Sequence, residues 1–190
     1  MEIRKFKDTD INPIVSLFYD TVHTVNKRDY SQEQLNAWAP KEEEILKRET
    51  WKDSLSQNVT YVADIKGTLV GFSDLTPYGR LNRLYVHKDY QGQGIAAALV
   101  NILEVEARGL GLLEVDTEAS ITAKPFFERL GYRIIQSQLV ERKGVRLANW
   151  KFDDPYRVLR RMVLGSCFLT MITTFHCTLY IRKWVNLADF

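Results

Sequence analysis

The sequence predicts a single α/β domain in which helices flank a mixed, mostly antiparallel central sheet. Apolar and polar residues alternate in seven short runs, as in strands with one buried face. Between the runs, apolar residues recur at helical spacing, and the resulting order is β-α-α-β-β-β-α-β-α-β-β. The chain has 190 residues, of which 45% are hydrophobic and 26% charged, so one ordinary globular core is expected.

The first half of the chain predicts one strand, two helical segments and a three-stranded meander. The strand covers 2–7, and a helix covers 10–26 with Ile11, Val15, Phe18 and Val22 on its apolar face. Ser31 and Gln34 have the spacing of a capping box, which begins a helix that Pro40 interrupts and that resumes over 41–54. Strands are expected at 59–65, 69–75 and 80–87, with Lys66-Gly67 and Pro77-Tyr78-Gly79 as the turns between them.

The second half alternates helices with strands and ends in a hairpin. A helix with the apolar stripe Ile95, Leu99, Ile102 and Leu103 is expected to end at Gly109. A strand over 112–117 and a helix over 122–130 follow, with Gly131 as the terminator of that helix. Strands over 132–141 and 145–152, joined by Lys143-Gly144, form the last antiparallel pair.

Composition excludes several classes of function. A formal net charge of +2 gives no reason to expect nucleic acid or an acidic membrane surface as a partner. Both cysteines, Cys167 and Cys177, lie near the C-terminus, so we expect no metal site, no disulfide framework and no covalent cysteine intermediate in the preceding body. The charged residues at the N-terminus are unlike a signal peptide, which favours a cytoplasmic protein.

The segment after Asp153 differs from the rest of the chain. An uncharged run over 162–181 is flanked by Arg160-Arg161 and Arg182-Lys183, and its length could cross a bilayer. The run also contains a serine, four threonines and a histidine, which disfavour insertion. We therefore expect a domain over 1–153 and a C-terminal appendage over 154–190, with a membrane tether as the alternative.

The strongest chemical signal is the glycine-rich turn Gln91-Gly92-Gln93-Gly94, which leads into a helix at Ile95-Ala96. Free backbone N–H groups and the positive end of the helix dipole favour a phosphate there. One alternative is a plain strand-to-helix turn. Another is a dinucleotide site, because 92–97 fits G-x-G-x-x-A and Glu114 lies at a suitable distance, although an antiparallel meander precedes the motif.

Two motifs resemble those of the GCN5-related N-acetyltransferases. Gln91, Gly94 and Ala96 match the signature Gln/Arg-x-x-Gly-x-Gly/Ala, and the segment 119–132 resembles the second motif of the family. The resemblance covers about 1–153. It implies acetyl-CoA as the acetyl donor and a primary amine, on a small molecule or a protein, as the acceptor. A homodimer is compatible with it.

The resemblance also implies where acetyl-CoA lies. Backbone groups of 84–86 pair with the pantetheine arm, the turn holds the pyrophosphate, and the opposite wall flanks the arm. The implied cofactor-binding residues are Leu84, Tyr85, Val86, Gln91, Gly92, Gln93, Gly94, Ile95, Ala96, Ser120, Ala123 and Phe126. Phe126 could equally be a core residue of its helix.

The catalytic candidates are a hydrogen-bond donor and a base. The Val86 N–H would stabilise the thioester oxygen as it gains charge. Asp74 is the first candidate for the base, because it shares strand parity with Val70 and Phe72 and so lines an apolar face; it could instead only order the following turn. His23 and Tyr30 are further candidates, from the segment that the resemblance places over the acceptor.

The chain departs from the family pattern at Phe127, where many members have a tyrosine that acts as general acid. A thiolate leaves without strong assistance, so activity is expected to survive, with Tyr132, Tyr85 or water as the proton donor. The departure also motivates an alternative function, a non-catalytic CoA-binding sensor or partner-binding module.

Overall fold

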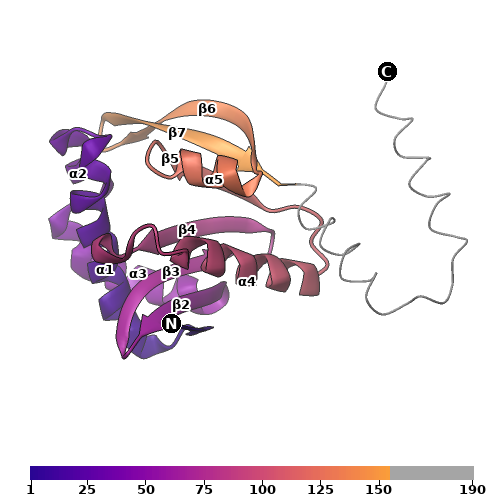
Figure 1. Ribbon diagram of the computed structural model, residues 1–190. Helices are drawn as coiled ribbons and strands as arrows, with labels where there is room; N and C mark the ends of the chain where they lie inside the picture. The colour runs from indigo at the N-terminus through magenta and orange to yellow at the C-terminus, as the bar shows by residue number, and fades with distance from the viewer. Residues whose placement is uncertain (155–190) are drawn as a thin grey trace, which may run out of the picture. The chain divides into compact units, whose positions relative to one another are not determined.

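The computed structural model describes residues 1–154, which fold into a seven-stranded sheet with helices on both faces (Figure 1). The elements in chain order are β1 (Glu2–Lys5), α1 (Ile11–Thr24), α2 (Gln32–Trp38), α3 (Glu44–Gln57), β2 (Val59–Ile65), β3 (Thr68–Leu75), β4 (Arg80–Val86), α4 (Ile95–Gly109), β5 (Asp116–Ser120), α5 (Lys124–Leu130), β6 (Arg133–Arg142) and β7 (Val145–Asp153).

The predicted fold class is confirmed. The strand order is β1-β2-β3-β4-β5-β7-β6, and every neighbouring pair is antiparallel except the β4–β5 pair. The capping box is present, since the Ser31 hydroxyl accepts from Gln34 N and the Gln34 side chain accepts from Ser31 N. Lys66-Gly67 and Lys143-Gly144 both have positive φ, as tight hairpin turns require.

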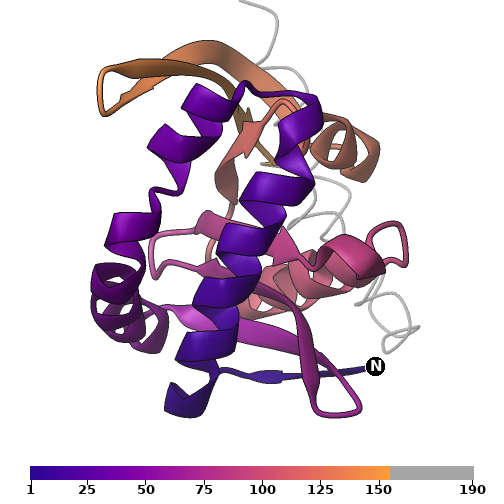
Figure 2. The same ribbon diagram turned by 90° about the vertical axis from the view of Figure 1, so that its left-hand side faces the viewer.

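Two apolar clusters pack on opposite faces of the sheet. On one face, α4 and α5 bury a cluster that includes Leu99, Leu103 and Phe127 against the strands. On the other face, α1, α2 and α3 bury a cluster that includes Phe18 and Leu35; α1 is in front of the sheet in Figure 2. Strand residues divide between the two clusters by the side on which they project.

The structure corrects the predicted bounds of one strand. The run 112–117 was expected to be a strand, but β5 covers Asp116–Ser120. Leu112 N donates to Ala107 O in the turn after α4, and the Val115 carbonyl accepts from Asp154 N. The strand pairing of β5 therefore begins at Asp116, although the buried alternation already starts at Val115 and continues at Thr117 and Ala119.

A β-bulge corrects the predicted parity of β3. The register between β2 and β3 shifts beside Ala63, so Val70 has no partner on β2. Val70 packs in the cluster under α4, whereas Phe72 packs in the cluster under α1. Phe72 and Val70 thus lie on opposite faces, and the predicted parity between them was wrong.

The sheet separates between β4 and β5. These strands pair only at Arg80↔Asp116 and Leu81↔Thr117, and the rest of each strand has no partner on the other. The register between β3 and β4 shifts at the same level, leaving Asn82 as a bulge. Because a bulge bends its strand, β4 turns away from β5 beyond this point.

No helix within residues 1–154 has the length and apolar character to cross a membrane. The run 162–181, for which a spanning helix was the alternative, lies outside the described residues.

Candidate active site

A cleft of about 540 Å³ occupies the separation between β4 and β5. This volume is in the range of small-molecule and cofactor sites. Its walls are β4, the glycine-rich turn with the start of α4, the end of β5 with α5, and the C-terminal end of α1. The cleft brings together eleven of the twelve predicted cofactor-binding residues; the exception is Gln93, whose amide nitrogen lies 3.5 Å from Asp89 O.

The edge of β4 that faces the cleft carries backbone groups without a strand partner. His87 N donates to Val70 O on β3 at 2.8 Å. Because successive residues of a strand direct their backbone groups to opposite sides, those of Val86 and Leu84 point away from β3, into the separation. The Val86 carbonyl accepts from the Thr21 hydroxyl at 3.2 Å and from Gln91 Nε2 at 2.5 Å, which fits this direction.

The glycine-rich turn presents the N-terminus of α4 to the cleft. Gly92 and Gly94 have φ of +73° and +79°, and a Cβ added to either would meet no atom within 4 Å. Gly94 is the N-cap of α4, and Ile95, Ala96 and Ala97 line the cleft with it. The first N–H groups of a helix lack intrahelical partners, so this end suits an anionic group such as a pyrophosphate.

The opposite wall comes from the end of β5 and the start of α5. The Ser120 hydroxyl accepts from Ala123 N at 3.2 Å, which holds the turn between the two elements. Ser120, Ala123 and Phe126 all line the cleft. Across the cleft, Asn26 Nδ2 donates to the Thr122 hydroxyl at 3.1 Å, which ties the segment after α1 to this wall.

Comparison with known families distinguishes an acetyl-CoA site from the dinucleotide site and the plain turn that the glycine-rich sequence also allows. The model of the family described as "Acetyltransferase (GNAT) domain" matches residues 26–153, most of the described chain. The chain belongs to this family of GNAT acetyltransferases. The suggested resemblance is thereby confirmed, and so is the prediction of a GNAT-type N-acetyltransferase with acetyl-CoA as co-substrate.

Individual relatives agree with this assignment. The chain is 32% identical over 152 residues to an uncharacterized N-acetyltransferase, YafP, of Escherichia coli K12, covering 79% of this chain and 93% of the relative. A GCN5-related N-acetyltransferase structure from Rhodopseudomonas palustris has a TM-score of 0.75 and 30% identity over 80% of this chain and 94% of its own. The PaiA N-acetyltransferase of Thermoplasma acidophilum, solved with coenzyme A, has the same fold, with a TM-score of 0.68 and 18% identity over 82% of this chain and 98% of its own.

Asp74 lies behind β4 and is not among the residues that line the cleft. Its side chain is fully buried and accepts from Asn58 Nδ2 at 2.7 Å and from Asn82 Nδ2 at 3.3 Å. Burial raises the pKa of this carboxyl group, against the opposing effect of Arg83 and the two amides. Asn82 and Arg83, which both contact Asp74, line the cleft, so Asp74 is linked to the cleft through these two side chains.

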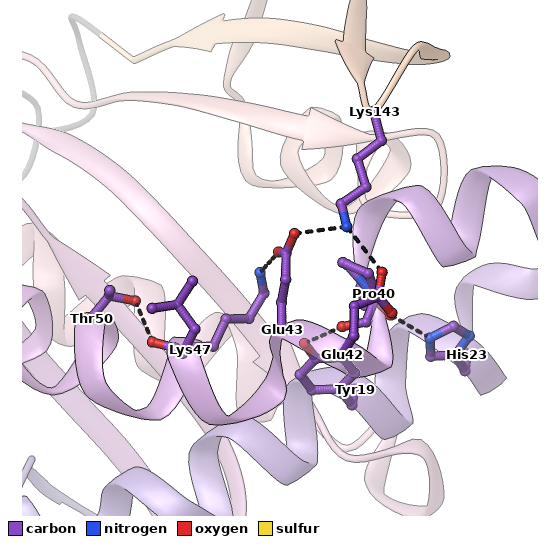
Figure 3. A network of polar contacts seen from close by, with 10 residues as sticks. Tyr19, His23, Pro40, Glu42, Glu43, Lys47, Thr50 and Lys143 are labelled. Atoms are coloured by element: carbon purple, nitrogen blue, oxygen red, sulfur yellow. Dashed lines mark hydrogen bonds and ion pairs between the residues drawn. The ribbon is translucent and has the colours of Figure 1, made fainter.

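His23 and Tyr30 are held by backbone groups. His23 Nε2 lies 2.9 Å from Ala39 O, beside the contact of the Tyr19 hydroxyl with Pro40 O; Figure 3 shows both contacts near the start of α3. His23 does not line the cleft. The Tyr30 hydroxyl donates to Ala148 O at 2.7 Å and accepts from Ile121 N at 2.9 Å, so it bridges β7 and the end of β5.

Phe127 lies in the middle of α5, where it lines the cleft but is almost fully buried, with its ring against Phe126, Tyr132 and Phe152. The Tyr132 hydroxyl donates to Glu104 on α4 at 3.1 Å, within the core. Of the two tyrosines proposed as proton donors, only Tyr85 lines the cleft. Burial raises the pKa of Tyr85 to about 12, so its hydroxyl stays protonated at neutral pH.

Glu118 is a cleft residue that the sequence interpretation missed. It is the only carboxylate among the residues lining the cleft, and no histidine lines it. Glu118 Oε1 lies 2.8 Å from Arg80 Nη2, and Glu118 Oε2 accepts from Asn149 Nδ2 at 3.4 Å. Burial acts to raise the pKa of Glu118, but Arg80 and the neighbouring amides outweigh it, so the pKa lies below its ordinary value.

A correct strand boundary would have revealed Glu118. Thr117 and Ala119 are buried, whereas Asp116 and Glu118 are not, and this alternation marks a strand over 116–120. With the strand ended at 117, Glu118 was placed in a connecting loop.

Proposed function

We propose that this enzyme transfers the acetyl group of acetyl-CoA directly to a primary amine, in the cleft between β4 and β5. The observation that carries the proposal is the junction of two binding features in one cleft: an open strand edge at Leu84–Val86 and the N-terminus of α4. An extended pantetheine arm can add to the strand edge as a further strand would. The pyrophosphate then meets the N–H groups after Gly94.

The residues of the cleft fit this ligand. The positive φ values at Gly92 and Gly94, and the open space beside both Cα atoms, leave room for phosphate oxygens to approach the backbone. Ser120, Ala123 and Phe126 supply the opposite wall for the arm.

When bound, acetyl-CoA supplies an acetyl thioester. The Val86 N–H, or the Leu84 N–H on the same edge, donates to the carbonyl oxygen as that atom gains negative charge. A neutral amine forms the new C–N bond, the C–S bond breaks with its electron pair on sulfur, and the nitrogen releases its extra proton to water. No cysteine lies within residues 1–154, so the amine attacks directly.

The leaving thiolate does not depend on a tyrosine. Protonating a thiolate, with an ordinary thiol pKa near 8.5, from Tyr85 at about 12 is uphill by about 5 kcal/mol. Water can therefore supply the proton to sulfur, and Phe127 in place of a tyrosine is compatible with turnover.

A matched pair of glycine variants tests the placement of the pyrophosphate. Gly94→Leu puts a side chain in the space beside the turn, and isothermal titration should show loss of acetyl-CoA binding. Gly111→Leu is the control, because Gly111 has a similar φ of +74°, equally open surroundings and no place in the cleft. Equal binding by the two variants would contradict the proposed site.

A second titration and an assay separate the alternatives. NAD should not bind, which distinguishes this site from a dinucleotide site. Release of free CoA thiol in the presence of amines should be measurable, whereas binding without turnover across a broad amine panel would favour the non-catalytic module.

A further inference from the structure

A second, smaller cavity continues the cleft on the side away from the glycine-rich turn. It has a volume of about 50 Å³ and lies between α2 and the β6–β7 hairpin. Trp38 and Ser120 line both cavities, so the two spaces adjoin. A molecule that enters here reaches the cleft without crossing the turn where the pyrophosphate is proposed to bind.

One buried acceptor atom at the junction of the two cavities has no hydrogen-bond donor within residues 1–154, and it belongs to Asn149. Asn149 lines the second cavity, and its Nδ2 donates to Glu118, a solvent-exposed residue that lines the cleft. The Oδ1 atom of Asn149 is buried and has no hydrogen-bond partner in the described part of the chain. A buried acceptor atom without a partner is costly, which an amine N–H donating to it would relieve.

A cation lies at the other end of the second cavity. Arg142, the last residue of β6, lines this cavity, and no carboxylate within residues 1–154 forms an ion pair with its guanidinium. The neighbouring Lys143 instead forms ion pairs with both Glu42 and Glu43. Arginine is suited to binding a carboxylate through two parallel hydrogen bonds.

The charges at the two ends of this space have opposite sign. Glu118 and Asn149 Oδ1 attract a hydrogen-bond donor, Arg142 attracts an anion, and Trp38 forms an apolar wall between them. Val145, the partner of Arg142, precedes Asn149 by four residues of β7, or about 13 Å of strand. Because the arginine side chain is long, the distance left between its guanidinium and Asn149 can be that of a small molecule.

We propose that the acceptor is a small amine that also carries a carboxylate, with its amine hydrogen-bonded to Glu118 and Asn149 and its carboxylate paired with Arg142. This inference rests on the proposed acetyl transfer and names the class of acceptor. Arg142 is then a specificity-determining residue that contacts the acceptor and takes no part in the thioester chemistry.

Matched acceptors test the inference in the full-length protein. Each amino acid is compared with the amine that remains when its carboxylate is removed: glycine with methylamine, alanine with ethylamine, and γ-aminobutyrate with propylamine. Turnover is followed by release of CoA thiol, and equilibrium binding of each acceptor is measured on the CoA complex. At least one amino acid should exceed its paired amine tenfold or more in both affinity and kcat/KM.

Two arginine variants assign the effect to a residue. Arg142→Ala should raise the KM of the preferred amino acid at least tenfold and leave the kcat/KM of the paired amine unchanged. Arg146→Ala is the control, because Arg146 is on the same hairpin and lines neither cavity. The inference would be overturned if Arg142→Ala had the same KM and kcat/KM as the wild type for both members of every pair.

The binding measurement separates this inference from the proposed function. Amino acids that bind through Arg142 but are never acetylated would support the acceptor site and refute acetyl transfer. Acetylation of simple amines as efficiently as of amino acids would support acetyl transfer and refute the carboxylate site. Failure of every amino acid to bind also refutes the carboxylate site.

Discussion

Asp74 Oδ2 lies 3.5 Å from Arg83 Nη1, and the two side chains form an ion pair that is almost fully buried behind β4. The Arg83 guanidinium also stacks over the Trp51 ring at 4.6 Å and donates to the Ser54 hydroxyl at 2.8 Å. The pair therefore joins β3 and β4 to α3 at the level where β4 begins to diverge from β5. This position suits a carboxylate that holds the strand in place, with Asn82 and Arg83 between it and the cleft.

Replacement of Asp74 separates a structural role from a catalytic one. Asp74→Asn keeps the shape but leaves the buried Arg83 without its counter-charge, which should cost about 3 to 5 kcal/mol of unfolding free energy. Urea unfolding measures that loss, with the exposed Asp53→Asn as the control on α3. The folded variant should keep its kcat within a few-fold; a loss of kcat of a hundredfold or more at full stability would instead support the predicted base.

Replacement of Tyr30, which lines the second cavity and not the cleft, separates the same two roles. Tyr30→Phe removes both hydrogen bonds of the hydroxyl and leaves the Ile121 N–H without its acceptor, which should cost about 1 to 3 kcal/mol. Because this change loosens the end of β5, the KM for the acceptor should rise more than kcat falls. A pH–rate profile of the variant that loses a basic limb would instead assign the hydroxyl a catalytic role.

The sequence predicted the parts of the fold that local signals determine. Gly94 with Gln91 identified the turn at the start of α4, and Lys143-Gly144 identified the last hairpin, because positive φ and capping leave marks in a few adjacent residues. The bulges opposite Ala63 and at Asn82 left no such mark. Both bulges arise from pairing between strands. The folded chain was therefore needed to see that Asp74 and Val70 lie on opposite faces of the sheet and that Asp74 does not line the cleft.

Lys143 joins the β6–β7 hairpin to the start of α3. Its Nζ lies 3.0 Å from Glu42 Oε1 and 2.8 Å from Glu43 Oε1. Figure 3 draws both ion pairs. Lys143→Ala should leave the urea midpoint almost unchanged, because exposed ion pairs contribute little to stability. Amide hydrogen exchange over 140–146 should become faster, since the hairpin loses a contact that limits its local opening.

Lys66→Ala is the matched control for Lys143→Ala. Lys66 holds the same first position of a Lys-Gly turn, with φ of 53° against 49° at Lys143, and no ion pair of Lys66 is present among the described residues. Faster exchange at both hairpins would mean that the turn residue itself is responsible. Faster exchange at neither would mean that the contacts with Glu42 and Glu43 do not restrain the hairpin.

Asp10 should govern part of the acid stability. Its carboxylate accepts from Arg4 Nη1 at 2.7 Å, from Arg4 Nη2 at 2.8 Å and from Lys7 N at 2.8 Å. Burial acts to raise the pKa of Asp10, but these hydrogen bonds and the charge of Arg4 outweigh it, so the pKa in the folded protein is below its ordinary value. An acid whose pKa is lower in the folded state stabilises the fold when it is ionised.

Because the pKa of Asp10 is lowered in the folded state, its contribution to stability is lost in the acid range. The stabilisation by Asp10 is complete above its unfolded pKa of about 3.9 and is lost as the pH falls through its folded pKa. Asp10→Asn should therefore lower the unfolding free energy by about 2 kcal/mol at neutral pH, the scale of hydrogen bonds to a charged group. Urea titrations from pH 7 down through pH 4 should show the wild type and the variant converging at the acid end. The unfolding free energy of the control Asp8→Asn, at an exposed position, should follow that of the wild type at every pH. A difference in unfolding free energy between Asp10→Asn and the wild type that stays constant through the acid range would show that the charge of Asp10 does not stabilise the fold.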